Sequence, residues 1–473
     1  MVGRERRTRR RARFLAVAAI VATAGCSLVA GLGDAPVVPP PTDDSGSSDA
    51  ASSDATTGPD SRVDAGAMDA TRVDGNPSDA RVATLGHIAA ARGMVYAARR
   101  QGTYSWGDFD DDSPLRALHR RDPDASTKKP GEVLGPDGGL FRVDEVSGSL
   151  FHVCARVGDL AYCWGTDLFT LLGGSLKAPS TTPVVGPGNA PLGGILQVAA
   201  GGYFSCARRA SDVLCWGGGG DYGKFAELGQ LGDPGASSEP AVAIPGLGAT
   251  RTIAVGHHHA CAALEPAGHV VCWGRNDLRQ AGSDAGAACP SGACVSPPTE
   301  VAGLRDVQQL ALGSRHSCAL TTAGEVFCWG GDLMYALGSA VVTQGCTAID
   351  PPETSVAGPC TATPQRVPLD SVDAIAAGED VSCAVKGGKV YCWGGNSPGP
   401  LGGGPSRTAP SPTPSVVLTS TGELTGMREV SLDLAFGCAI GAADAVYCWG
   451  PGGALGSSDP NVGMDGYAVP VVF

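Results

Sequence analysis

The sequence is poor in aromatic residues and lacks the common catalytic motifs. Aromatics make up 5% of the 473 residues, whereas Gly (70) and Pro (35) are abundant. Such a composition favours short strands and tight turns over long helices. The sequence contains no phosphate-binding P-loop and no HExxH zinc motif. We therefore predict a β-rich chain that is not an enzyme and needs no cofactor.

Positive charge is scarce outside the N-terminus. The whole chain carries a formal charge of −13, but residues 1–25 contribute seven Arg and one Glu. Residues 26–80 contribute ten Asp and two Arg, and the remainder of the chain is also acidic. An acidic domain repels phosphate backbones, so we expect no nucleic-acid partner.

The first 25 residues have the pattern of a signal peptide. The basic segment Arg4–Arg13 precedes an apolar run, Phe14–Gly25, whose 12 residues are fewer than the roughly 20 of a spanning helix. Thr23-Ala24-Gly25-Cys26 resembles the bacterial lipoprotein processing box. That resemblance implies a lipid on Cys26, a cell-envelope location and, since Ser27 follows, the outer membrane. The alternative is ordinary signal cleavage nearby.

Residues 26–81 lack the apolar side chains that a folded core requires. The segment is rich in Asp, Ser, Ala, Thr, Pro and Gly, and such chains cannot bury enough surface to offset the loss of conformational entropy. We therefore expect a disordered tether between the lipidated Cys26 and the rest of the protein.

All seven tryptophans belong to one recurring motif. Each is followed by Gly, six are preceded by Cys, and successive Trp residues are 52 to 64 positions apart. They are Trp106, Trp164, Trp216, Trp273, Trp329, Trp393 and Trp449. A period of this size with strand-like flanks indicates a β-repeat architecture, and seven copies suit a closed ring.

Twelve of the 17 cysteines form pairs within six repeats. The expected pairs are Cys154 with Cys163, Cys206 with Cys215, Cys261 with Cys272, Cys318 with Cys328, Cys383 with Cys392 and Cys438 with Cys448. A Gly387-Gly388 turn would place Cys383 opposite Cys392, at the distance a disulfide needs. The first repeat has Ala97 and Ser105 where we expect the cysteines. This paired loss favours disulfides over metal sites, and disulfides indicate an oxidising compartment.

The repeats share further residues beyond the Cys-Trp-Gly motif. Gly313-Ser-Arg-His316-Ser-Cys318 and Gly324-Glu-Val-Phe-Cys-Trp329-Gly330 resemble the regulator of chromosome condensation repeat. The resemblance covers residues 82–473 and implies a seven-bladed β-propeller of four-stranded antiparallel blades. The Pro-containing C-terminal segment, Tyr467–Phe473, looks like a strand that opens a repeat. We expect it to close the ring by completing the first blade.

Two groups of side chains could be metal ligands, and for both we expect a structural role. His257, His258 and His259 adjoin a repeat position that His152 and His316 also occupy, and that position belongs to the fold. Asp108 to Asp112 form an acidic loop, which we expect to be solvated. We predict no metal site.

Two long loops each carry an extra pair of cysteines. Cys289 and Cys294 follow Trp273, and Cys346 and Cys360 follow Trp329. We expect a disulfide in each loop, and both loops on one face of the ring. Preorganised loops lower the entropic cost of binding, so these are the candidate binding loops. Protection from proteolysis is the alternative.

These features favour an envelope-anchored, monomeric propeller that binds a protein or a glycan. The rival interpretations are a secreted enzyme with a site in the central funnel, a protein inhibitor acting through one face, and a purely structural envelope protein. The eukaryotic family role, guanine nucleotide exchange, is disfavoured by the export signal and the acidic charge.

Overall fold

The computed structural model describes most of the repeat region. The described residues are 87–91, 93–107, 129–135, 137–165, 171–173, 182–218, 230–231, 238–284, 287–289, 292–339, 342, 344–350, 354–396, 399–433, 435–450, 455 and 466–473. Cys26, the tether and the Asp108–Asp112 loop lie outside them. Within the described residues, the structure has no helix of the length and apolar character that crossing a membrane requires.

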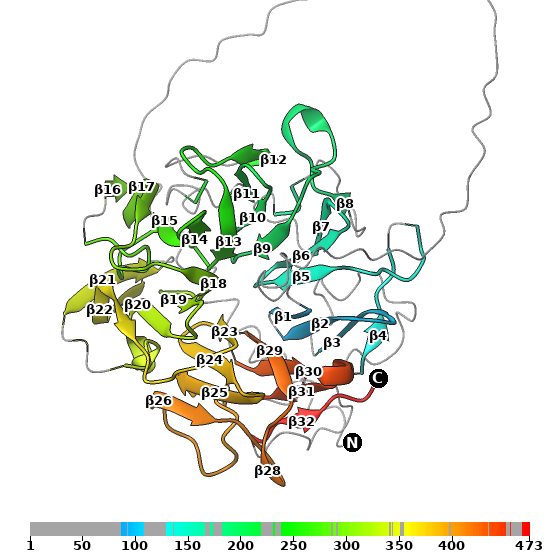
Figure 1. The fold of residues 1–473 in the computed structure, drawn as a ribbon, viewed down its shortest axis with the longest axis vertical. Helices are drawn as coiled ribbons and strands as arrows, with labels where there is room; N and C mark the ends of the chain where they lie inside the picture. Colours follow the sequence, from blue (N-terminus) through cyan, green and yellow to red (C-terminus); the bar gives the residue numbers. More distant parts are fainter. Residues whose placement is uncertain are drawn as a thin grey trace, which may run out of the picture. The chain divides into compact units, whose positions relative to one another are not determined.

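Seven antiparallel sheets follow one another along the chain as the blades of a propeller (Figure 1). Each runs from an inner strand outwards. Blade one comprises β1 (Ile88–Ala91), β2 (Met94–Arg99), β3 (Gly102–Gly107) and β4 (Gly131–Glu132), and blade two β5 (Glu145–Gly148), β6 (His152–Val157), β7 (Leu160–Gly165) and β8 (Thr182–Pro183). Blade three comprises β9 (Gln197–Ala200), β10 (Phe204–Arg208), β11 (Val213–Gly217) and β12 (Ser238–Ala243).

Blades four and five each have a fifth strand. Blade four has the order β13 (Thr250–Val255), β14 (His259–Leu264), β15 (His269–Arg275), β17 (Gly292–Glu300) and β16 (Ala287–Cys289). Blade five has the order β18 (Val307–Leu312), β19 (His316–Thr321), β20 (Val326–Gly331), β22 (Thr354–Arg366) and β21 (Gly345–Asp350). The Cys-bracketed loops predicted from the sequence are therefore β-hairpins that widen two neighbouring blades.

The last two blades have four strands each. Blade six comprises β23 (Ala374–Ala377), β24 (Val381–Lys386), β25 (Lys389–Gly394) and β26 (Ser411–Val416). Blade seven comprises β29 (Met427–Leu432), β30 (Gly437–Gly441), β31 (Val446–Trp449) and β32 (Val469–Pro470), after a small hairpin of β27 (Leu418–Thr419) and β28 (Gly422–Glu423). The described residues contain only short 3₁₀ helices: η2 (Pro187–Asn189), η4 (Leu333–Tyr335) and η5 (Ala442–Asp444).

The ring closes through its inner strands. Each inner strand contacts the next one around the ring, and β29 of the last blade contacts β1 of the first. The apolar cores lie between neighbouring blades. One cluster, for example, combines Trp106 and Val95 of blade one with Ile440 and Val446 of blade seven. All seven tryptophans are fully buried. The predicted seven-bladed propeller is confirmed.

The C-terminal strand does not complete blade one, so that part of the prediction is wrong. Cys448 of β31 pairs with Val469 of β32, which makes β32 the outer strand of blade seven itself. Blade one obtains its outer strand from Gly131 and Glu132. Each sequence repeat begins with the inner strand of a blade and ends with its outer strand. The Pro-containing segment is therefore the last strand of the repeat that it follows.

The C-terminus nevertheless seals the junction between blades seven and one by side-chain packing. The Phe473 ring lies edge-on against Trp106 and Tyr104, with centroid separations of 5.5 and 5.3 Å. Across the same junction, Gly93 N donates to Asp433 Oδ2 at 2.8 Å and Ala90 N donates to Ser431 Oγ at 3.0 Å. The seam therefore depends on side chains and not on an exchanged strand.

Candidate functional site

The Trp-Gly motif fixes both the hairpin and the contact with the preceding blade. The Gly after each Trp has a positive φ, and a Cβ on Gly274 would lie 2.6 Å from the carbonyl oxygen of His258. Only glycine fits such a position. For five of the tryptophans, the Nε1–H donates to a carbonyl in the loop of the preceding blade, as from Trp393 to Ala336 O at 3.0 Å. The motif is therefore structural.

The repeated histidines link neighbouring blades. His152, His259 and His316 are fully buried, and their Nε2 atoms lie 2.5, 2.8 and 2.8 Å from Ser Oγ atoms of the next blade. Two of these serines, Ser317 and Ser382, donate their own hydroxyl proton to a loop carbonyl. The histidine must therefore be the donor, with its proton on Nε2.

These histidines stay neutral at physiological pH. Burial lowers the pKa of His152 and His259 to about 3 and that of His316 to about 4. A neutral imidazole in this tautomer has its second nitrogen free of a proton, and no hydrogen-bond partner for Nδ1 is found among the described residues. Their role is to join blades, as the sequence predicts.

Histidine and serine occur together across blade junctions in this chain. Each of the three histidines faces a Ser in the next blade. At the four other junctions, neither residue is present. The corresponding pairs there are Met94 with Val153, Phe204 with Ala260, Val381 with Gly437, and Phe436 with Val95. Sequence inspection missed this pairing, although the Ser that precedes Cys in three repeats was a visible signal.

A second set of links joins the inner strands. Gln197 accepts from Ile253 N at 2.9 Å and donates to Ile253 O at 3.0 Å, and Gln309 does the same with Ile375. In blade two the position is Glu145, whose carboxylate accepts from Val198 N at 3.1 Å. Burial raises the pKa of Glu145 to about 7, despite that bond and the nearby Arg156.

Aromatic side chains of three consecutive blades form one half of a rim around the opening of the ring. They lie in the turn after each inner strand. Phe151 and Tyr203 have ring centroids 5.6 Å apart, and Tyr203 stacks on His258 at 4.5 Å with an interplanar angle of 12°. Burial and the nearby Arg275 lower the pKa of His258, so its ring is uncharged. Phe151 and Tyr203 are partly exposed, whereas the His258 ring on which Tyr203 stacks is buried.

The same turn position carries charge in the next two blades. Arg315 lies 3.6 Å from Glu379 and 3.5 Å from Asp380. Beside them the loop after Trp329 exposes Met334 and Tyr335, with 58% and 51% of their surface accessible. Both have a positive φ, which is uncommon for such residues. We call Phe151, Tyr203, His258, Arg315 and Asp380 the rim residues.

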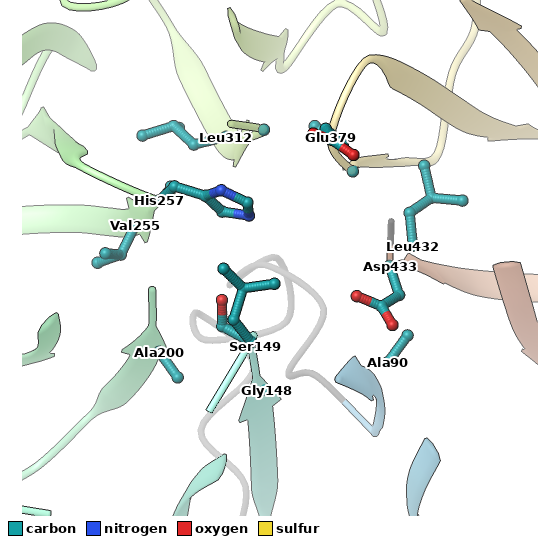
Figure 2. A pocket seen from close by; sticks show the side chains of 15 residues that line it. Ala90, Gly148, Ser149, Ala200, Val255, His257, Leu312, Glu379, Leu432 and Asp433 are labelled. Carbon is teal, nitrogen blue, oxygen red and sulfur yellow. The ribbon is translucent and has the colours of Figure 1, made fainter. Parts of the chain in front are cut away.

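The axial opening itself is small. Figure 2 shows the side chains of His257, Glu379 and Asp433 pointing into it from three different blades. The cavity has a volume of about 60 Å³, enough for a few water molecules. His257 lies 2.8 Å from Ser314 Oγ. Across the described residues, no three His, Cys, Asp or Glu side chains are placed to hold a metal ion.

The cysteines predicted to pair are brought together, and all eight pairs are bonded. Six disulfides cross the blade hairpins between directly opposed residues, and each of the two added hairpins holds one more. The hairpin disulfides join Cys154 with Cys163, Cys206 with Cys215, Cys261 with Cys272, Cys318 with Cys328, Cys383 with Cys392 and Cys438 with Cys448. The added hairpins join Cys289 with Cys294 and Cys346 with Cys360. The structure joins the cysteines in the same eight pairs that the sequence predicts.

The first blade corrects one detail of the register. Tyr96, not Ala97, lies opposite Ser105. The hairpin turn there has two residues, which shifts the expected position by one. Tyr96 fills the space that a disulfide occupies in the other blades, and its ring packs against Trp164.

Each added hairpin pairs with the strand that carries Trp-Gly, at the C-terminal end of that strand. Arg275 pairs with Cys294 and Gly331 with Cys360. The rim turns lie at this same end, since Arg275 N donates to His258 O and Gly331 N donates to Arg315 O, each at 2.9 Å. We call this end of the propeller the hairpin face.

The repeat that forms each blade is also found in known proteins. Residues 307–333 match the family model described as "Regulator of chromosome condensation (RCC1) repeat". This stretch spans the inner strand, the His-Ser-Cys hairpin and Trp329-Gly330 of blade five. Blade five therefore carries a regulator of chromosome condensation repeat, and the seven-bladed ring resembles solved structures of that family.

The sequence is also similar to proteins of other organisms. The chain is 26% identical to Protein pim1 of Schizosaccharomyces pombe over 50% of its own length and 44% of that protein. It is 29% identical to the mouse RCC1-like G exchanging factor-like protein, over 44% and 42% of the two lengths. The chain thus matches less than half the length of these relatives.

Solved structures share the family fold. Prp20p of Saccharomyces cerevisiae superimposes with a TM-score of 0.57 and 20% identity, covering 78% of this chain and 82% of that one. Human WBSCR16 gives a TM-score of 0.59 at 18% identity, covering 76% and 90%. At this level of identity, the likeness concerns the fold of the repeat family only.

Proposed function

We propose that the protein is a binding scaffold that holds a protein or glycan on its hairpin face. The observation that carries the proposal is the coincidence of two features on blades four and five. Both blades carry an added, disulfide-bonded hairpin, and both contribute a rim residue, His258 and Arg315. Aromatic surface beside charged groups is typical of binding surfaces.

Two further observations support binding over catalysis. The axial cavity of about 60 Å³ is far smaller than the usual ligand pocket of roughly 300–1,000 Å³. The repeated buried histidines are engaged in links between blades. The family also includes protein binders, because the solved Prp20p was described with its binding properties to Gsp1p and histones.

Replacing the tips of both added hairpins with short Gly-Ser turns should abolish partner binding with little change in melting temperature. The four-stranded blades remain, because β16 and β21 are the outermost strands of their sheets. The measurement is recovery of the wild-type partner, identified first by proximity labelling of the anchored protein and mass spectrometry. Unchanged recovery would assign the hairpins a protective role instead.

Two positions for a photo-reactive residue, both in blade five, test which end of the propeller binds the partner. Thr347 is exposed on the β21–β22 hairpin, and Ala323 is exposed in the turn between β19 and β20 at the opposite end. A photo-reactive residue at position 347 should capture the same partner, whereas one at position 323 should not. Equal capture at both positions would contradict a binding site on the hairpin face.

We further propose that the chain acts as a monomer at the cell envelope, anchored by a lipid on Cys26. The basic, apolar and Cys-terminated start of the sequence supports export, and eight disulfides suit an oxidising compartment. Cys26→Ser should release the protein from membranes, or stop its processing, while the propeller keeps its melting temperature. Membrane fractionation tests this, and wild-type protein found wholly in the soluble fraction would refute the anchor.

A further inference from the structure

A second cavity lies at the end opposite the hairpin face, where blades seven, one and two meet. Its volume is about 460 Å³, and arginines from all three blades line it. Arg99 ends β2, Arg100 lies in the β2–β3 turn, Arg156 comes from β6 and Arg428 from β29. Asp144 and Asp444 are the carboxylates of the lining.

This lining is positive although the whole chain carries −13. Four arginines against two aspartates give a surplus of two positive charges when His87 is neutral. The two carboxylates behind the lining bond to the blade junctions and also face two of its arginines, since Glu145 lies 3.7 Å from Arg156 and Glu429 lies 3.9 Å from Arg428. Glu145 accepts from Val198 N, and Glu429 accepts from His87 N.

The two aspartates are engaged by two of the four arginines. Asp144 lies 3.4 Å from Arg156, and Asp444 lies 3.4 Å from Arg428. Among the described residues, no carboxylate pairs with the guanidinium of Arg99 or Arg100. The Nε of Arg99 is buried and has no hydrogen-bond partner there. The surplus charge therefore resides on these two side chains.

Arg99 is held in place by aromatic rings. Its guanidinium carbon lies 3.8 Å from the Phe473 ring centroid and 5.6 Å from that of Tyr104. A stacked guanidinium keeps the N–H groups of its edge available, in the fork that matches the oxygens of a carboxylate or phosphate. The donors are therefore oriented before a ligand arrives, which lowers the entropic cost of binding.

We propose that this cavity binds a phosphate monoester, with Arg99 and Arg100 as the ligands of its oxygens. A phosphate monoester carries a charge of about −1.5 to −2 at neutral pH, which matches the two uncompensated arginines. A lipid headgroup and a soluble metabolite both present the same three oxygens, and the two sources are distinguished by the probes used below.

The test is isothermal titration of the purified, disulfide-bonded full chain with glycerol 1-phosphate, and flotation with vesicles that contain phosphatidic acid. We expect Arg100→Gln, which changes an exposed side chain, to weaken binding by at least about tenfold. Arg99→Lys keeps the charge but loses the fork, so it should also weaken binding. Arg366→Gln is the matched control, because Arg366 pairs with Glu325 and Asp370.

Binding of glycerol 1-phosphate supports the site with a soluble ligand, and binding of vesicles alone supports it with a lipid ligand. The proposal is overturned if neither probe binds at millimolar concentration. It is also overturned if Arg100→Gln binds as the wild type does, or if Arg366→Gln loses as much affinity as Arg100→Gln. This cavity is independent of the hairpin face, so replacement of the hairpins should leave phosphate binding unchanged.

Discussion

Gly313→Ala should destabilise the propeller by at least about 2–3 kcal/mol, although it adds one methyl group. A Cβ at this position would lie 2.3 Å from the carbonyl oxygen of Gly378 and 2.5 Å from the ring of His316. The first atom belongs to the backbone of the next blade, and the second to a buried ring held by Ser382. Neither can move without opening the junction between blades five and six. The midpoint of thermal unfolding should fall by several degrees.

The matched control is Gly248→Ala. A Cβ on Gly248 would meet no atom within 4 Å, and its backbone does not require glycine. Alanine there should leave stability unchanged or raise it by up to about 1 kcal/mol, because it restricts the unfolded chain. If both variants unfold at the wild-type temperature, the close approach at Gly313 does not limit the fold.

Glu145→Gln should stabilise the protein at pH 8, by about 1–3 kcal/mol. The Glu145 side chain is buried, and burial raises its pKa from 4.5 to about 7. One pKa unit corresponds to about 1.4 kcal/mol, so the charged form carries a cost of about 3 kcal/mol. Glutamine can instead make the two-way bond to the next blade that Gln197 and Gln309 make.

The sign of the pH dependence follows from proton binding. Between pH 4.5 and 7 the folded state holds a proton on Glu145 that the unfolded state has lost, so stability decreases as pH rises through this window. The difference between Glu145→Gln and the wild type should therefore be small near pH 4 and reach its full size above pH 7. Urea unfolding across this range measures it.

The reverse change, Gln309→Glu, is the counterpart at the junction between blades five and six. It should lower stability above pH 7, where the introduced carboxylate is charged, and have less effect at low pH. A pH-independent difference in either variant would mean that the carboxylate charge is not the cause.

In six blades the hairpin could be predicted from the sequence, because a cysteine on each of its two strands marks which residues face each other. Cys383 and Cys392 face each other across the Gly387-Gly388 turn, and the observed register is the predicted one. In the first blade that marker is absent, and the prediction was off by one residue, at Ala97. The spacing of cysteines therefore carried more information about register than the apolar pattern did.

Contacts between blades could not be read from one repeat. His316 and Ser382 are 66 positions apart, and each looks like an ordinary polar residue within its own strand. The Pro-containing strands were ambiguous for a similar reason, because an edge strand suits either neighbouring sheet until its partner is known. The residues around the Arg99 cavity come from blades seven, one and two, which include the first and last blades of the chain, so no local sequence pattern predicts the cavity.

Since β32 stays in its own blade, every sheet of this ring is a continuous stretch of the gene. Cutting the chain between any two blades and joining the old ends would leave all seven sheets intact, as a circular permutation. Duplication or loss of a whole blade would likewise need no rewriting of a shared strand. Each blade can therefore evolve as a separate unit without altering the sheets of the other blades.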